Sequence, residues 1–97
     1  MSTTEVITNL RLSAQRALLG EVTENLVAVT CGLDNHLVKL NAYFNGEVSE
    51  DDIERIQSVG TEVIADFPNN FMIEEKCFSV DDHAPEVLDF WVYKKAD

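Results

Sequence analysis

The apolar positions at the start of the chain follow a helical spacing. Over residues 9–19, apolar side chains recur at steps of three and four, which predicts a helix. We expect Asn9 to cap the start of this helix and Gly20 to end it, because glycine readily adopts the left-handed conformation. Residues 2–8 show no clear period, and we expect them to form a loose lead-in.

The next part of the chain changes to a period of two. Residues 27–31 and 38–44 both alternate side chains in this way and contain β-branched residues, which is typical of strands. Between them, Asp34 and Asn35 suit a turn, since both side chains can bond their own backbone and both tolerate positive φ. These residues therefore predict a β-hairpin.

A second amphipathic pattern begins after Ser49. From Ile53 to Phe67, apolar residues recur at steps of three and four, with Gly60 inside the stripe. Ser49 is a natural cap for this helix, and Pro68 is expected to end it. A glycine inside a helix costs about 1 kcal/mol relative to alanine, but it leaves room for another element to approach closely.

The last third of the chain predicts two more strands, over residues 71–80 and 88–95, separated by a polar loop that contains Pro85. The element order is then α-β-β-α-β-β. Because neighbours joined by short turns usually pair antiparallel, we predict one α+β domain over residues 1–97. It would contain an antiparallel four-stranded sheet with both helices packed on one face, and its other face would be left open.

The charge of the chain restricts the partners that it can bind. Eighteen acidic residues against seven basic ones give a net charge of −11 and a pI near 4.3. Such a surface repels nucleic-acid phosphates and anionic membranes, so we expect neither as a direct partner. It attracts a basic protein surface and speeds the encounter with it. The alternative interpretation is that the charge serves solubility alone.

The sequence offers little sign of export or of redox chemistry. The first ten residues lack the basic and apolar regions of a secretory signal, and no apolar run approaches the roughly 20 residues that span a bilayer. We therefore expect a cytoplasmic protein. Cys31 and Cys77 do not form a disulfide framework, and we expect both to be reduced and partly buried.

Candidate catalytic or metal-binding residues are few. The sequence has no glycine-rich phosphate loop, no H-E-x-x-H, no C-x-x-C and no G-x-S-x-G. His36 lies at the predicted hairpin turn, where a solvated histidine is the ordinary case. His83 follows Asp81 and Asp82 and could join them in holding a divalent metal, although three adjacent loop residues rarely form a coordination sphere. We therefore predict no enzyme activity, no metal and no cofactor.

Two segments concentrate acids without any base, and these are the candidates for binding a partner. Residues 47–54 contain five acids, three of which are also explained by the helix dipole, and residues 81–89 contain four. The second segment leads into Trp91 and Tyr93, which would face the open side of the sheet if Phe90 faces the core. In the reverse register, Trp91 would belong to the core. The candidate partner-binding residues are Asp51, Asp52, Glu54, Asp81, Asp82, Glu86, Asp89, Trp91 and Tyr93.

Several stretches resemble small bacterial immunity proteins of contact-dependent growth inhibition systems. They are LRLSAQRALLGEV at 10–22, AYFNGEVSEDD at 42–52, TEVIADFP at 61–68 and WVYKK at 91–95. The resemblance implies a cytoplasmic antitoxin that binds one toxin domain, often a basic nuclease, and masks its active site. The acidic charge agrees with this, since carboxylates can occupy a site built for phosphates. The alternatives are an acidic adaptor or nucleic-acid mimic that binds another basic protein, and a small enzyme or ligand-binding domain.

Overall fold

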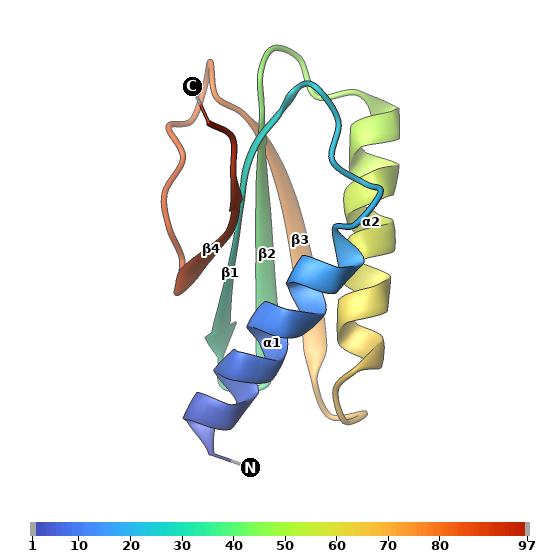
Figure 1. Cartoon of the computed structure of the whole chain (residues 1–97), viewed down its shortest axis with the longest axis vertical. Coiled ribbons are helices and arrows are strands. Elements are labelled where there is room, and N and C mark those ends of the chain that lie inside the picture. The colour runs from blue at the N-terminus through green and yellow to red at the C-terminus, as the bar shows by residue number, and fades with distance from the viewer. Residues whose placement is uncertain (1, 97) are drawn as a thin grey trace.

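Residues 2–96 contain two helices and four strands, which follow one another along the chain in the expected order (Figure 1). The computed structural model describes residues 2–96. The elements are α1 (Thr3–Ala17), β1 (Leu26–Asp34), β2 (Leu37–Phe44), α2 (Glu50–Ala65), β3 (Met72–Ser79) and β4 (Phe90–Lys94). The hairpin turn is formed as expected, with Asn35 at a φ of 55°.

Helix α1 begins earlier than its apolar spacing suggested. Ser2 caps it, and the Ser2 side chain accepts a hydrogen bond of 3.2 Å from the backbone N–H of Glu5. Val6 is buried and extends the apolar stripe by one turn toward the N-terminus. The prediction of a loose lead-in over residues 2–8 was therefore wrong, and Asn9 lies inside the helix instead of capping it.

The sheet is mixed, with the strand order β3-β2-β1-β4. β1 pairs antiparallel with β2 and with β4, but β2 and β3 are parallel. The prediction of a purely antiparallel sheet was therefore wrong for this pair. The cause is α2, which runs back along the sheet so that β3 starts at the same end as β2 (Figure 1). As a result, β3 and β4 follow each other in the sequence but lie at opposite edges of the sheet.

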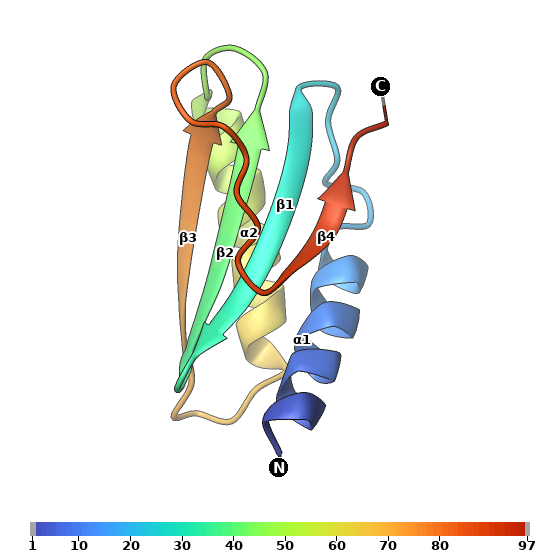
Figure 2. The ribbon, with the colours of Figure 1, turned by 90° about the vertical axis from the view of Figure 1, so that its left-hand side faces the viewer.

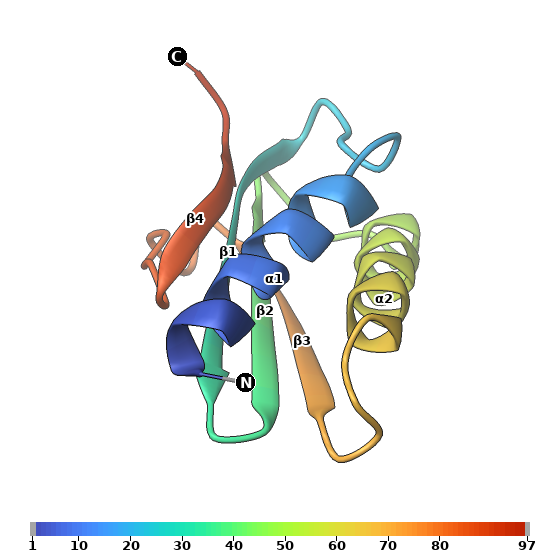
Figure 3. The ribbon, with the colours of Figure 1, turned by 60° about the horizontal axis from the view of Figure 1, so that its bottom comes forward.

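Both helices pack on the same face of the sheet, as expected (Figure 3). α1 contacts β1 and β4, while α2 contacts β3 and β2. Between the layers lies one cluster of buried apolar side chains, in which Leu10 of α1, Leu40 of β2 and Ile56 of α2 are almost completely excluded from solvent. Burial of these apolar surfaces is the main stabilising contribution to the fold.

The other face of the sheet is not left open. Residues 80–89, here called the crossing segment, run from the end of β3 across β2 and β1 to the start of β4 (Figure 2). The backbone N–H of Glu86 donates to the Tyr43 hydroxyl (3.3 Å), and that of Leu88 donates to the Thr30 hydroxyl (2.9 Å). A Cβ at Gly32 would lie only 3.0 Å from the Leu88 Cβ, so glycine permits this close approach. The expectation of an uncovered face was therefore wrong over β1 and β2.

Candidate partner-binding surface

The parallel pairing of β2 and β3 brings two acidic segments together. The carboxyl ends of parallel strands lie at the same end of a sheet, so the loops that follow β2 and β3 are neighbours. The first loop carries Glu47, and the second carries Asp81 and Asp82. These three residues line one hollow of about 480 Å³, together with His83 and part of β3. No lysine or arginine is among the described residues that line it.

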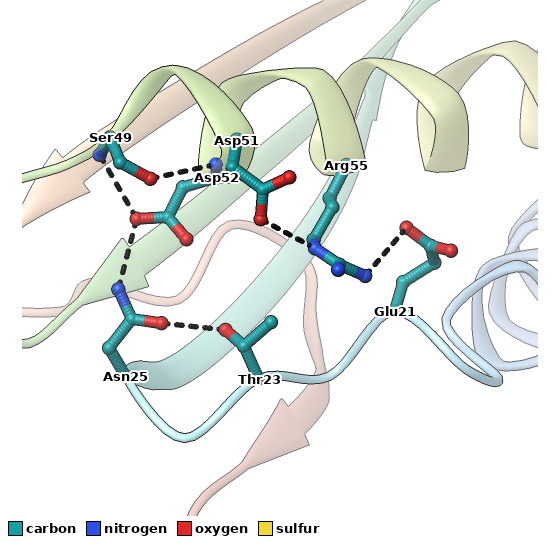
Figure 4. Close-up of polar contacts among 7 residues, drawn as sticks. All are labelled: Glu21, Thr23, Asn25, Ser49, Asp51, Asp52 and Arg55. Atoms are coloured by element: carbon teal, nitrogen blue, oxygen red, sulfur yellow. Dashed lines mark hydrogen bonds and ion pairs between the residues drawn. The ribbon is translucent and has the colours of Figure 1, made fainter.

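The start of α2 adds further negative charge beside this hollow. Glu50, Asp51 and Glu54 are all exposed on its first turns. Arg55 offsets part of this charge, since its Nε lies 2.9 Å from Asp51 and one of its terminal nitrogens lies 3.8 Å from Glu21 (Figure 4). We call this surface the acidic end; its residues are Glu47, Glu50, Asp51, Glu54, Asp81 and Asp82.

Asp52 is buried and does not belong to this surface. Its carboxylate accepts hydrogen bonds from the backbone N–H of Ser49 (3.0 Å) and from the side-chain amide of Asn25 (2.9 Å). Ser49 in turn accepts from the Asp52 backbone N–H, and Thr23 donates to Asn25 (Figure 4). This is a capping box extended to the loop before β1. The expectation that Asp52 contacts a partner therefore does not fit its position, because it stabilises the start of α2.

The acids of the second predicted segment do not form one patch. Asp81 and Asp82 lie at the acidic end, whereas Glu86 lies where the crossing segment passes Tyr43 of β2. Asp89 is near the opposite end of the sheet, where its carboxylate accepts a 2.8 Å hydrogen bond from the backbone N–H of Leu33. The crossing segment therefore spreads these four carboxylates along the length of the sheet.

The aromatic residues at the start of β4 face opposite sides of the sheet. Phe90 pairs with Cys31 and is buried on the helix side, where the Arg11 guanidinium lies 4.5 Å from its ring centre. Trp91 pairs with Thr30 on the side of the crossing segment. This is the register in which Trp91 lies outside the helix-side core. β4 is at the far edge from β3, so Trp91 is not a neighbour of the acidic end.

A β-bulge changes the direction of Tyr93. The register between β1 and β4 shifts between Val29 and Thr30, so that Tyr93 pairs with Val29 of the helix-side core. Trp91 and Tyr93 therefore do not share a face, and the expectation that Tyr93 faces the open side was wrong. The side chain beside Trp91 is that of Lys94, whose ammonium lies 5.1 Å from the Trp91 ring centre.

The two histidines lie against aromatic rings. The ring centres of His83 and Phe78 are 4.9 Å apart, and Phe78 stacks on Tyr43 with ring centres 5.2 Å apart. The ring centres of His36 and Phe71 are also 4.9 Å apart. Within residues 2–96, no three His, Cys, Asp or Glu side chains are grouped so that they could hold a metal ion. The part of the chain that the structure describes also contains no helix long and apolar enough to cross a membrane.

Both cysteines are free thiols. Burial raises the pKa of Cys31 to about 12. For Cys77 the pKa rises to about 11, through burial first and then through the negative charges of Asp52 and Glu75. A thiol with a raised pKa is a poor nucleophile near neutral pH, so neither residue has the properties of a catalytic cysteine.

Glu47 belongs to the first acidic segment but was not among the candidate binding residues, and it lines the hollow. The missing information was the direction of β3, because only the parallel pairing makes Glu47 a neighbour of Asp81 and Asp82. Local charge patterns indicate which segments are acidic, but they do not indicate which segments meet.

Comparison with known proteins agrees with the resemblance found in the sequence. No curated protein matched the chain. A family model described as MafI2 immunity protein matches residues 7–97, which is nearly the full length. The match confirms that the chain is similar to small bacterial immunity proteins, whose partners are toxins. The chain belongs to the MafI2 immunity protein family.

Proposed function

We propose that this chain neutralises a cognate nuclease toxin by covering its active site with the acidic end. Membership of an immunity protein family supports a toxin as the partner. A nuclease active site is built to hold phosphates and is therefore basic, so an acidic inhibitor can bind in place of the substrate. The net charge of −11 supports a partner of this kind.

The observation that carries the proposal is the meeting of two acidic segments around one hollow. Glu47, Asp81 and Asp82 come from segments more than thirty residues apart, yet they line the same concave surface. A basic group that enters this hollow would face all three carboxylates. The first turn of α2 extends the negative surface through Glu50 and Glu54.

Charge at such a surface acts mainly on the rate of association. Opposite fields steer the two proteins together and raise the association rate constant by roughly 10-fold to 1000-fold at low salt. Salt screens exposed charges over a Debye length of about 10 Å at 0.1 M. Raising the salt concentration should therefore slow association far more than it speeds dissociation.

The experiment uses a catalytically inactive form of the cognate toxin domain. Stopped-flow association rates are measured from about 20 to 500 mM salt, where we expect a fall of about tenfold or more. Asp81→Lys with Asp82→Lys should slow association at low salt by a similar factor. The matched control, Glu5→Lys with Glu62→Lys, changes the net charge equally but alters exposed acids on the helices away from the acidic end.

Three results would count against the proposal. An association rate that does not change with salt would rule out charge steering. Equal effects of the two charge-reversed variants would mean that only the net charge matters, and not the acidic end. Failure of the active toxin domain to degrade DNA or RNA would show that it is not a nuclease. Trp91→Ala tests the other edge of the sheet: if it weakens binding strongly while the protein stays folded, the interface lies on β4.

A further inference from the structure

A second, smaller hollow lies between α2 and the edge strand β3. Its volume is about 240 Å³, and its lining residues are Ile53, Ile56, Gln57, Glu75 and Cys77. Ile53 and Ile56 form an apolar part of the wall, and Ile53 is 40% exposed although it is a large hydrophobic residue. Cys77 also lines the hollow at the acidic end, so the two hollows adjoin along β3.

Among the described residues that line this hollow, Glu75 carries the charge, and it faces the core side of the sheet. Glu75 pairs with Leu40, which is fully buried beneath the helices, so the Glu75 side chain points toward α2 and not toward the crossing segment. Its neighbour Glu74 points to the opposite side and forms a 3.2 Å ion pair with Lys76. A carboxylate on the core side of an edge strand is unusual, because charged groups are normally kept in water.

Gly60 provides the space for this carboxylate. A Cβ built on Gly60 would lie 2.7 Å from Cδ and 2.8 Å from Cγ of Glu75, so the acid lies directly against the bare backbone of α2. The φ angle of Gly60 is not positive, and the glycine is therefore not needed for its backbone conformation. Glycine weakens a helix relative to alanine. What it provides here is room for Glu75.

Among the ion pairs of the described residues, none includes the Glu75 carboxylate. Within residues 2–96, it takes part in no ion pair and no hydrogen bond. The pKa of the neighbouring Cys77 thiol is raised mainly by burial and further by the negative charges of Asp52 and Glu75. Two isoleucines beside an unpaired carboxylate match a side chain with a long aliphatic stem and a cationic head.

We propose that this hollow receives one lysine or arginine side chain of the toxin, with its stem against Ile53 and Ile56 and its charge on Glu75. The proposal rests on the proposed function, since it names an anchor within that interface. The acidic end steers the toxin toward this surface, and the anchored cation slows its departure, because a partly desolvated charge pair acts mainly on dissociation.

The first test does not need the toxin. The chain labelled with ¹⁵N is titrated with N-acetyl-arginine amide, and N-acetyl-citrulline amide serves as the uncharged control. We expect saturable shifts of the Gly60, Glu75 and Cys77 amide signals with the arginine compound only. In Glu75→Gln the affinity should fall about tenfold, whereas Glu74→Gln, which removes the same charge one residue away, should behave like the wild type. An absence of saturable shifts in the wild type would overturn the proposal.

Gly60→Ala provides an independent variant. Alanine favours the helix, so the protein should stay folded, but its methyl group takes the space of the Glu75 side chain and displaces the carboxylate. The arginine compound should then bind about as weakly as it binds Glu75→Gln. Wild-type affinity in Gly60→Ala would show that the position of Glu75 against α2 is not what creates the site.

The second test measures dissociation of the inactive toxin domain. Glu75→Gln should raise the dissociation rate about tenfold or more with little change in association, while Glu74→Gln should change dissociation by less than about twofold. Unchanged dissociation from Glu75→Gln would overturn the proposal. A dimer of the wild-type chain that is lost in Glu75→Gln would also overturn it, because the cation would then come from a second copy. If the wild-type chain does not bind the toxin domain, the proposed function fails, and the arginine titration still decides whether the hollow holds a cation.

Discussion

Replacing Asp52 by alanine separates a structural acid from a binding one. The carboxylate accepts two hydrogen bonds, from the Ser49 N–H (3.0 Å) and the Asn25 side chain (2.9 Å). Hydrogen bonds to a charged group contribute about 1.5–3 kcal/mol each, and a helix cap contributes about 0.5–2 kcal/mol. These contributions overlap because they share one carboxylate, so we expect Asp52→Ala to lower the free energy of unfolding by about 2–4 kcal/mol.

The matched control is the preceding residue, which has the same charge but is exposed. Asp51 takes part in a surface ion pair with Arg55 and lies in the first turn of α2, so Asp51→Ala should lower the free energy of unfolding by only about 0.5–1 kcal/mol. Asp52→Asn keeps the size of the side chain and one acceptor oxygen, so it should lower the free energy of unfolding by less than Asp52→Ala and by more than Asp51→Ala.

Urea unfolding followed by circular dichroism gives these free energies, and thermal melting provides a second measurement. Each kcal/mol lowers the melting temperature of a domain of this size by about 4–8 °C, so Asp52→Ala should melt at least about 8 °C below the wild type. The folded Asp52→Ala protein should still bind the toxin domain at the wild-type rate. Equal stabilities of the Asp51→Ala and Asp52→Ala variants, or lost binding by a stable Asp52→Ala protein, would refute the structural role of this residue.

Two further predictions concern the crossing segment and the thiols. Thr30→Val keeps the side-chain shape but removes the buried hydroxyl that donates to the Phe90 carbonyl and accepts from the Leu88 N–H. Unfolding experiments should therefore show that the free energy of unfolding falls by about 1–3 kcal/mol. A fall of less than about 0.5 kcal/mol would contradict this role. The pKa of Cys31 is raised to about 12 and that of Cys77 to about 11, so both thiols should react slowly with iodoacetamide at pH 7.5. Mass spectrometry should show much faster labelling after unfolding. Rapid labelling of the native protein would argue against the burial that raises these pKa values.

The local elements of this protein could largely be predicted from its sequence. The period of two over β1 and β2, the Asp34–Asn35 turn and the Ser49 cap each depend on neighbouring residues, and all three are found in the structure. The start of α1 was missed because Val6 and Ile7 are adjacent apolar residues in a polar segment, and such a pair gives no clear period by itself. The acidic character and the family resemblance also came from the sequence.

The arrangement of those elements was decided by tertiary contacts. Alternation shows that a segment is a strand but not which strand lies beside it, so the parallel pairing of β2 with β3 was not visible in the pattern. The route of the crossing segment depends on Gly32, Thr30 and Tyr43, which are distant from it in sequence. A single bulge between β1 and β4 was enough to turn Tyr93 toward the core.

The candidate site, like the fold, was predicted only in part from the sequence. The sequence by itself determined that the surface is acidic and that residues 47–54 and 81–89 carry much of the charge. Only the tertiary structure decided that Glu47 meets Asp81 and Asp82, that Asp52 is an internal cap, and that Glu75 lies against Gly60. The physical reason is that charge and periodicity are properties of neighbouring residues, whereas a binding surface is made by residues that folding brings together from distant parts of the chain.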